Sequence, residues 1–178
     1  DAMSGGKVVR IAGGQGFWGD WLEAPVRQVQ GGPIDYLMMD YLAEVTMSIM
    51  QKQRSRNPHA GYARDFVPLM ERLLPALAER KVRVTTNAGG VNPRACAAAV
   101  AEVARRLGLA GKLTIGVVTG DDLLDRVDAL LAAGIGNINL IKVSSILPPG
   151  VGLVALPRIK SGALVATVVV SPAGASLL

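Results

Sequence analysis

The chain has 178 residues; half are hydrophobic, 19% are charged, only 4% are aromatic, and the formal net charge is +5. This length fits one domain, or one domain with an appendage. The Lys and Arg residues are scattered along predicted helices, and no basic run is interleaved with aromatic residues, which argues against nucleic-acid binding. The low charged fraction predicts an oligomer or a part of a larger protein.

The single cysteine, Cys96, lies in an Ala-rich helical run, where a small buried residue is expected. A thiol nucleophile would need a nearby imidazole, and the one histidine, His59, falls in a polar loop. One cysteine excludes an intrachain disulfide, which fits a reducing compartment. We see no signal peptide and no apolar run of about 18 residues or more. We therefore predict a cytoplasmic protein that does not enter a membrane.

The first part of the chain alternates β-rich and helical patterns. Residues 7–12 predict a first strand, which ends in a glycine-rich turn. Asn92 followed by Pro93 is a strong helix start signal, and Pro75 is expected to kink its helix. Further strands are predicted at 34–39 and 82–86, and helices at 23–30, 42–56, 66–80 and 93–107.

The second part continues the alternation and then changes. A strand is predicted at 113–118, a helix from Asp121 or Asp122 to about Gly134, and a strand at 138–143. After a Pro- and Gly-rich loop, residues 162–170 predict a hydrophobic strand. This order predicts an α/β fold: one mostly parallel sheet of about five strands with helices on both faces, plus a C-terminal strand or hairpin.

The loops that follow the strands are the expected ligand site, because open parallel sheets bind ligands at the carboxyl ends of their strands. Glycines in the first loop would allow close backbone approach, and helix starts in later loops offer free N–H groups to an anion such as a phosphate of coenzyme A. The glycine run is not the dinucleotide fingerprint. The candidate substrate-binding residues are Gly14, Gln15, Asp20, Asp40, Glu44, Asn87, Asn92 and Asp121.

Several of these candidates also have a structural interpretation. Asn92 and Asp121 are adequate as helix caps alone. Asp40 and Glu44, four residues apart, suit a paired acid or metal site, or a favourable position near a helix start. Two tryptophans in the first loop would line an apolar pocket or pack the loop onto the core. We predict no metal site.

Five motifs occur in order through the first part of the chain. They are RIAGGQGFWGD at 10–20, IDYLMMDYLAEVT at 34–46, NPHAGY at 57–62, TNAGGVNP at 86–93 and GDD at 120–122. Over about residues 9–133 the chain thereby resembles the N-terminal region of the AtuA (acyclic terpene utilisation) family. The resemblance implies a metabolic domain that binds an organic acid or acyl-CoA in the catabolism of acyclic terpenes such as citronellol.

A second resemblance begins near residue 128. The run ALLAAGIGNINLIKVSSILPPG at 129–150, continued at 156–157 and 162–166, is similar to pyruvoyl-dependent arginine decarboxylases. That resemblance implies self-cleavage between Ser144 and Ser145, with Ser145 becoming a pyruvoyl group and Asn139 assisting. The ketone would form a Schiff base with the arginine amine and act as electron sink for decarboxylation, as in a lyase.

The chain departs from the pattern of pyruvoyl-dependent arginine decarboxylases at several positions. The family usually has an acidic residue two places before the Ala-Leu-Leu run, but this chain has Val127 there and Asp128 one residue later. The family's acidic proton donor would lie beyond residue 178. The family builds its site between subunits of a trimer, which implies a homo-oligomer. Complete decarboxylation is therefore not expected from this chain, although self-cleavage is possible.

The two resemblances predict two regions, residues 1–134 and 135–178, with a seam at 128–134. Joining parts of two enzymes predicts a chimeric or non-natural chain. Three hypotheses follow. The first is an AtuA-like domain that binds a small-molecule substrate. The second is a self-processing pyruvoyl enzyme fragment whose substrate would be arginine, and the third is a non-catalytic protein-binding module of designed or chimeric origin. Fold alone does not decide among them.

Overall fold

The computed structural model describes residues 8–120, 122, 124–133, 138–141, 154–157 and 168–172. Its elements, in chain order, are β1 (Ile11–Gln15), α1 (Glu23–Gly31), β2 (Tyr36–Met39), α2 (Glu44–Arg56), α3 (Phe66–Arg80), β3 (Arg83–Thr86), α4 (Pro93–Arg106), β4 (Leu113–Val117), the 3-10 helix η1 (Leu124–Arg126), α5 (Val127–Ala132), β5 (Ile138–Ile141), β6 (Val154–Pro157) and β7 (Val168–Pro172).

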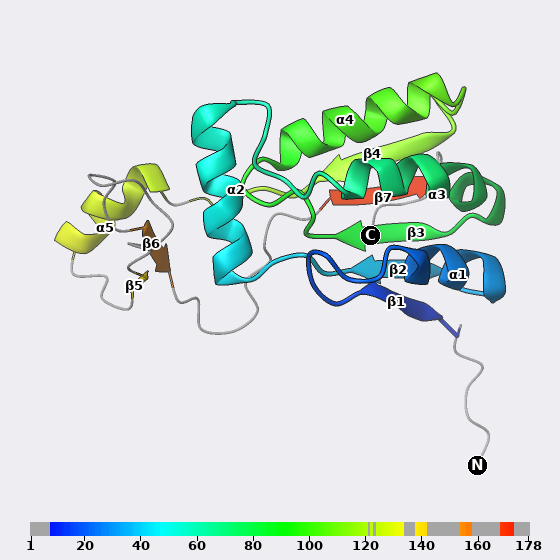
Figure 1. Ribbon diagram of the computed structural model, residues 1–178, viewed down its shortest axis with the longest axis horizontal. Helices are drawn as coiled ribbons and strands as arrows, with labels where there is room; N and C mark the ends of the chain where they lie inside the picture. Colours follow the sequence, from blue (N-terminus) through cyan, green and yellow to red (C-terminus); the bar gives the residue numbers. More distant parts are fainter. Residues whose placement is uncertain are drawn as a thin grey trace, which may run out of the picture.

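The main sheet has the strand order β1-β2-β3-β7-β4 (Figure 1). β1, β2 and β3 run parallel, which confirms the α/β prediction for this part of the chain. β7 lies antiparallel between β3 and β4, where Val170 is opposite both Val84 and Ile115.

The strand expected at 138–143 is not part of this sheet. Its described portion, β5, pairs antiparallel with β6 in a separate two-stranded sheet. β7 takes the place beside β3 that sequence order would give to a parallel strand. The place of the fifth strand was therefore predicted wrongly, because an antiparallel insertion leaves no mark on local sequence patterns.

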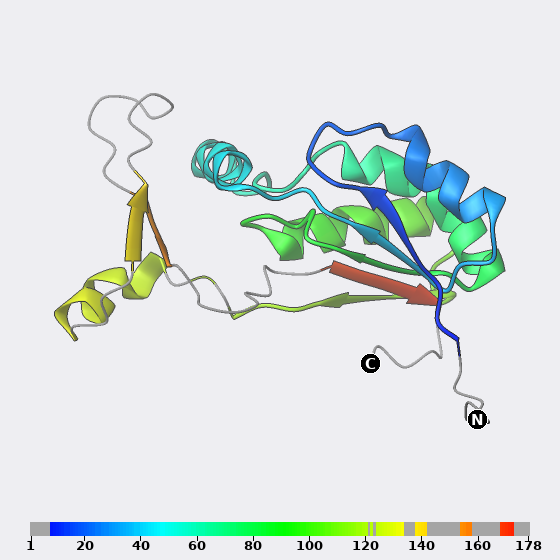
Figure 2. The ribbon, with the colours of Figure 1, turned by 90° about the horizontal axis from the view of Figure 1, so that it is seen from below.

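The helices that contact the main sheet cover one face of it. α1, α3 and α4 lie together on one side in Figure 2. Leu37 and Met39 of β2 are fully buried on that side, whereas Met38 between them is 49% exposed and Ile11 of β1 is 69% exposed. Alternate side chains of a strand point to opposite faces. The prediction of helices on both faces is therefore wrong for the described part of the chain.

The core lies between this sheet face and the helices. α3 supplies more of it than any other element, through residues at helical spacing that include Leu69, Leu73 and Leu77. α3 continues as one helix through Pro75 and ends at Lys81, which adopts a left-handed conformation with φ of 59°. The described helices include none that is long and apolar enough to cross a membrane.

α2 has a different position from the other long helices. Figures 1 and 2 both show it beyond the carboxyl ends of β2 and β3, apart from the layer of α1, α3 and α4. It begins at Glu44, two residues later than predicted, where the Thr46 hydroxyl accepts a hydrogen bond from the Ala43 backbone N–H at 2.7 Å. The fold thereby places α2 next to the loops in which ligand-binding residues were predicted.

Candidate functional site at the carboxyl edge of the sheet

The loops after β1, β2 and β3 meet at one edge, as expected for parallel strands. The Asp40 backbone N–H donates to the Gln15 carbonyl at 3.0 Å, which joins the first two loops. The segment between α2 and α3 is joined to the loop after β3, because the Ala63 N–H donates to the Ala88 carbonyl at 2.9 Å. We call this region the carboxyl edge, made of residues 15–22, 40–44, 57–65 and 87–92.

An aspartate and an asparagine hold the second and third loops together. Asn87 Nδ2 donates to Asp40 Oδ1 at 2.6 Å, and Asn87 Oδ1 accepts from the Tyr41 backbone N–H at 2.7 Å. Asp40 Oδ1 also accepts from the Leu42 N–H at 3.1 Å. Both amide atoms of Asn87 are thus occupied within the protein. Its partner Asp40 is engaged with Asn87, while Glu44 is exposed in the first turn of α2.

Asp20 fixes the loop that follows β1. Its carboxylate accepts hydrogen bonds from the backbone N–H groups of Gly16 at 3.0 Å and Trp21 at 2.7 Å. These two bonds lower the pKa of Asp20 below its ordinary value. Trp18 anchors the same loop by donating from Nε1 to Asp65 Oδ1 at 2.8 Å. Asp20 is therefore explained by loop geometry, and Trp18 packs the loop onto the core as one alternative predicted.

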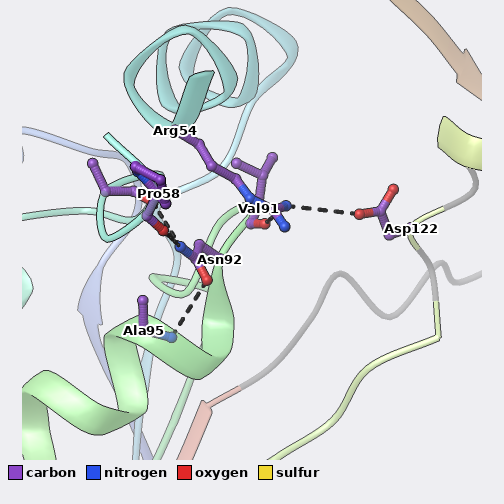
Figure 3. A network of polar contacts seen from close by, with 7 residues as sticks. Arg54, Pro58, Val91, Asn92, Ala95 and Asp122 are labelled. Atoms are coloured by element: carbon purple, nitrogen blue, oxygen red, sulfur yellow. Dashed lines mark hydrogen bonds and ion pairs between the residues drawn. The ribbon is translucent and has the colours of Figure 1, made fainter. Parts of the chain in front are cut away.

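Asn92 acts as the helix cap that the sequence indicated. Its Oδ1 accepts from the Ala95 N–H at 3.4 Å, and its Nδ2 donates to the carbonyls of Pro58 and Ala60, each at 2.8 Å (Figure 3). In the same network Arg54 of α2 donates to the Val91 carbonyl at 2.6 Å. The side chain of Asn92 therefore ties α4 to the segment between α2 and α3.

Figure 3 also shows the Arg54 guanidinium directed toward Asp122, which follows β4. The two charged groups are 3.8 Å apart, and their side chains are 41% and 68% exposed, so the pair contributes little stability. Asp121, the neighbouring candidate, lies outside the described residues.

Packing is close around two glycines, Gly14 in β1 and Gly90 in the carboxyl edge. A Cβ at Gly14 would lie 3.0 Å from side-chain atoms of Leu37, Met39 and Pro25, so Gly14 lets α1 approach the sheet. Gly90 has a φ of +54°, and a Cβ there would lie 2.3 Å from Met50 Sδ and 2.8 Å from the Gly61 carbonyl oxygen. Sequence analysis did not single out Gly90; the second glycine of TNAGGVNP was the signal for it.

Gln15 differs from the other candidates because its side chain has no structural task in the described part of the chain. The residue is 6% exposed, yet neither Oε1 nor Nε2 has a hydrogen-bond partner among the described residues. Its backbone carbonyl faces the Asp40 N–H, which places the residue at the start of the carboxyl edge. A buried amide without partners is uncommon in proteins and requires an explanation.

Tyr41 is a second residue of this kind, and the sequence analysis missed it. Its side chain is fully buried, its ring packs edge-to-face on Phe66 at 5.8 Å, and its hydroxyl has no partner among the described residues. Burial, with smaller effects of Asp65 and Cys96, raises the pKa of Tyr41 far above its ordinary value. The phenol is therefore neutral at physiological pH. A tyrosine directly after Asp40 was the available signal.

Cys96 fits its predicted role as a small core residue. It is fully buried in α4, and burial raises the pKa of its thiol to about 12. A thiol that stays protonated is a poor nucleophile. The described residues also contain no group of three or more His, Cys, Asp or Glu side chains that would hold a metal ion.

The candidates of the second resemblance lie mostly outside the described residues. Ser144 and Ser145 are both outside them. Asn139 lies in β5, opposite Leu156 of β6. Of these three residues, the structure therefore describes only Asn139, and of Asn139 only the backbone.

Comparison with curated proteins supports the second resemblance. The chain is 52% identical over 56 residues to the pyruvoyl-dependent arginine decarboxylase of Methanocaldococcus jannaschii, a match covering 31% of this chain and 34% of that protein. Over 54 residues it is 50% identical to the protein of that name from Methanothermobacter thermautotrophicus, covering 30% and 36%. The chain thus spans about a third of the length of these relatives. No solved structure matches it significantly.

Comparison with family models supports the first resemblance. The model described as acyclic terpene utilisation family protein AtuA matches residues 9–147. This range includes the whole carboxyl edge, and it extends past residue 134 to include the serine pair. Both resemblances seen in the sequence are thereby confirmed. The match covers well over half of the chain, which belongs to the acyclic terpene utilisation family AtuA.

Proposed function

We propose that the chain is an AtuA-type metabolic domain that binds an organic acid or its acyl-CoA ester at the carboxyl edge. The observation that carries this proposal is the buried amide of Gln15, which has no hydrogen-bond partner among the described residues. An unsatisfied buried polar group costs roughly 1–3 kcal/mol. A ligand that bonds to this amide would recover that free energy.

The surrounding residues then have positioning roles. Asn87 and Asp40 fix the loops after β2 and β3, and Asp20 fixes the loop after β1. Asn92 fixes the start of α4. Because these side chains are already engaged with the protein, they hold the edge in a defined shape. We assign direct ligand contact to Gln15; Tyr41 is another buried group of the edge whose side chain has no hydrogen-bond partner among the described residues.

A thermal-shift titration with a medium-chain acyl-CoA tests this function. At a ligand concentration one hundred times the Kd, binding to the native state stabilises it by about 2.7 kcal/mol, so a clear rise in Tm is expected. The Gln15→Leu variant serves as the control and should show a much smaller rise. Unchanged Tm in the wild-type chain at saturating acyl-CoA would contradict the proposal and favour a non-catalytic protein-binding module.

A second candidate function rests on the identity of 50% or more to pyruvoyl-dependent arginine decarboxylases. We propose that residues 135–178 form a separate segment that cleaves itself between Ser144 and Ser145. A pyruvoyl group made from Ser145 would supply an electron sink for removing the carboxyl group of an amino acid such as arginine. Because the chain spans about a third of those relatives, we propose self-cleavage without complete decarboxylation.

A further inference from the structure

The carboxyl edge contains four acidic side chains, Asp20, Asp40, Glu44 and Asp65, and one arginine, Arg64, so acidic groups predominate there. Asp20, Asp40 and Asp65 all lie there, and each accepts its hydrogen bonds from backbone N–H groups or from neutral side chains. The ion pairs found among the described residues involve none of these three aspartates. A ligand that brings its own carboxylate to this edge would therefore meet like charge.

The buried polar groups at the same edge are neutral. Gln15 offers an amide that both donates and accepts, and Tyr41 offers a hydroxyl that does the same. Neither is accompanied by a buried lysine or arginine among the described residues, because the buried polar residues there are Gln15, Ser48 and Thr86. Neutral donors in an apolar setting suit a neutral carbonyl, since burying an unpaired carboxylate is far more costly.

The loop after β1 adds apolar surface beside Gln15. Phe17 and Trp21 are both exposed there, and Arg27 stacks over the Trp21 ring at 4.8 Å. Trp18 anchors the loop by its bond to Asp65, and Asp20 anchors it by accepting from the backbone of Gly16 and Trp21. Exposed aromatic side chains next to buried neutral donors suit a ligand with an apolar chain and an uncharged polar head.

We propose that the carboxyl edge selects acyl thioesters, whose carbonyl is neutral, and rejects the corresponding free carboxylates. This inference rests on the proposed function and narrows it to one of its two ligand classes. Gln15 Nε2 is the group that donates to the thioester carbonyl. The aspartates act from a distance, by opposing a negatively charged head group.

Equilibrium binding at neutral pH tests the inference with octanoyl-N-acetylcysteamine, a neutral thioester, and with octanoate. The thioester should bind the wild-type chain at least tenfold more tightly than octanoate, and Gln15→Leu should weaken thioester binding at least tenfold. Asp65→Asn keeps an oxygen to accept from Trp18 Nε1 but removes the charge. It should strengthen octanoate binding several-fold and leave thioester binding unchanged.

The outcomes separate this inference from the function on which it rests. Octanoate that binds as tightly as the thioester would overturn the selectivity while leaving the proposed function intact. Equal thioester binding by wild type and Gln15→Leu would show that Gln15 does not bind the thioester carbonyl, and it would overturn the inference. If the wild-type chain binds neither probe and does not bind octanoyl-CoA, the proposed function itself is overturned.

Discussion

Replacing Gly90 with alanine is expected to lower the free energy of unfolding by about 2–6 kcal/mol. Gly90 has a φ of +54°, and strain at such a position costs about 1–3 kcal/mol for other residues. The new Cβ would also lie 2.8 Å from the Gly61 carbonyl oxygen. Met50 can move its flexible end, but the backbone oxygen cannot yield without separating the two loops, and overpacking adds about 1–3 kcal/mol.

Gly19→Ala is the matched control for this effect. Gly19 also has a positive φ, +97°, but a Cβ there would meet no atom within 4 Å. Its substitution should cost only the backbone strain, about 1–3 kcal/mol, without the added overpacking. Denaturant unfolding of both variants measures the difference. Equal losses for the two variants would show that the contact between Gly90 and Gly61 does not hold the carboxyl edge together.

The pyruvoyl proposal predicts that the purified chain is two polypeptides under denaturing conditions. The fragments should correspond to residues 1–144 and 145–178, and the second should have a blocked N-terminus. Its mass should be lower than that of the simple hydrolysis product by the mass of ammonia, because conversion of Ser145 to pyruvoyl removes its amino group. Intact mass spectrometry distinguishes these products directly.

Ser145→Ala removes the hydroxyl that would attack the preceding carbonyl, and it should abolish the cleavage completely. Ser144→Ala keeps that hydroxyl and serves as the companion variant, which should retain cleavage. A wild-type chain that remains intact after prolonged incubation would contradict self-processing. Binding at the carboxyl edge would then be the remaining proposed activity.

Local sequence signals predicted the parts of the site that depend on neighbouring residues. Asn92 before Pro93 indicated a helix cap, and the structure places it there. The position of Gln15 and Asp40 at strand ends followed from the parallel order of β1, β2 and β3. These features are set by a few residues in succession, which is why a single sequence was sufficient to find them.

Other features depend on contacts between distant segments. The insertion of β7 between β3 and β4 pairs Val169 with Thr85 and Gly116, which no local pattern indicates. Likewise the task of Asn87 became evident only when its bonds to Asp40 and Tyr41 were known. Tyr41 was missed because a buried hydroxyl without a partner among the described residues is a property of packing.

The central claim is that Gln15 serves a ligand and not the fold. The most direct measurement is the free energy of unfolding of Gln15→Leu without ligand, beside Asn87→Leu. Removing an unpaired amide should leave stability unchanged or raise it by about 1–2 kcal/mol, whereas removing the paired amide of Asn87 should cost about 2–4 kcal/mol. A loss of more than about 2 kcal/mol in Gln15→Leu would show that its amide has structural partners and would contradict the claim.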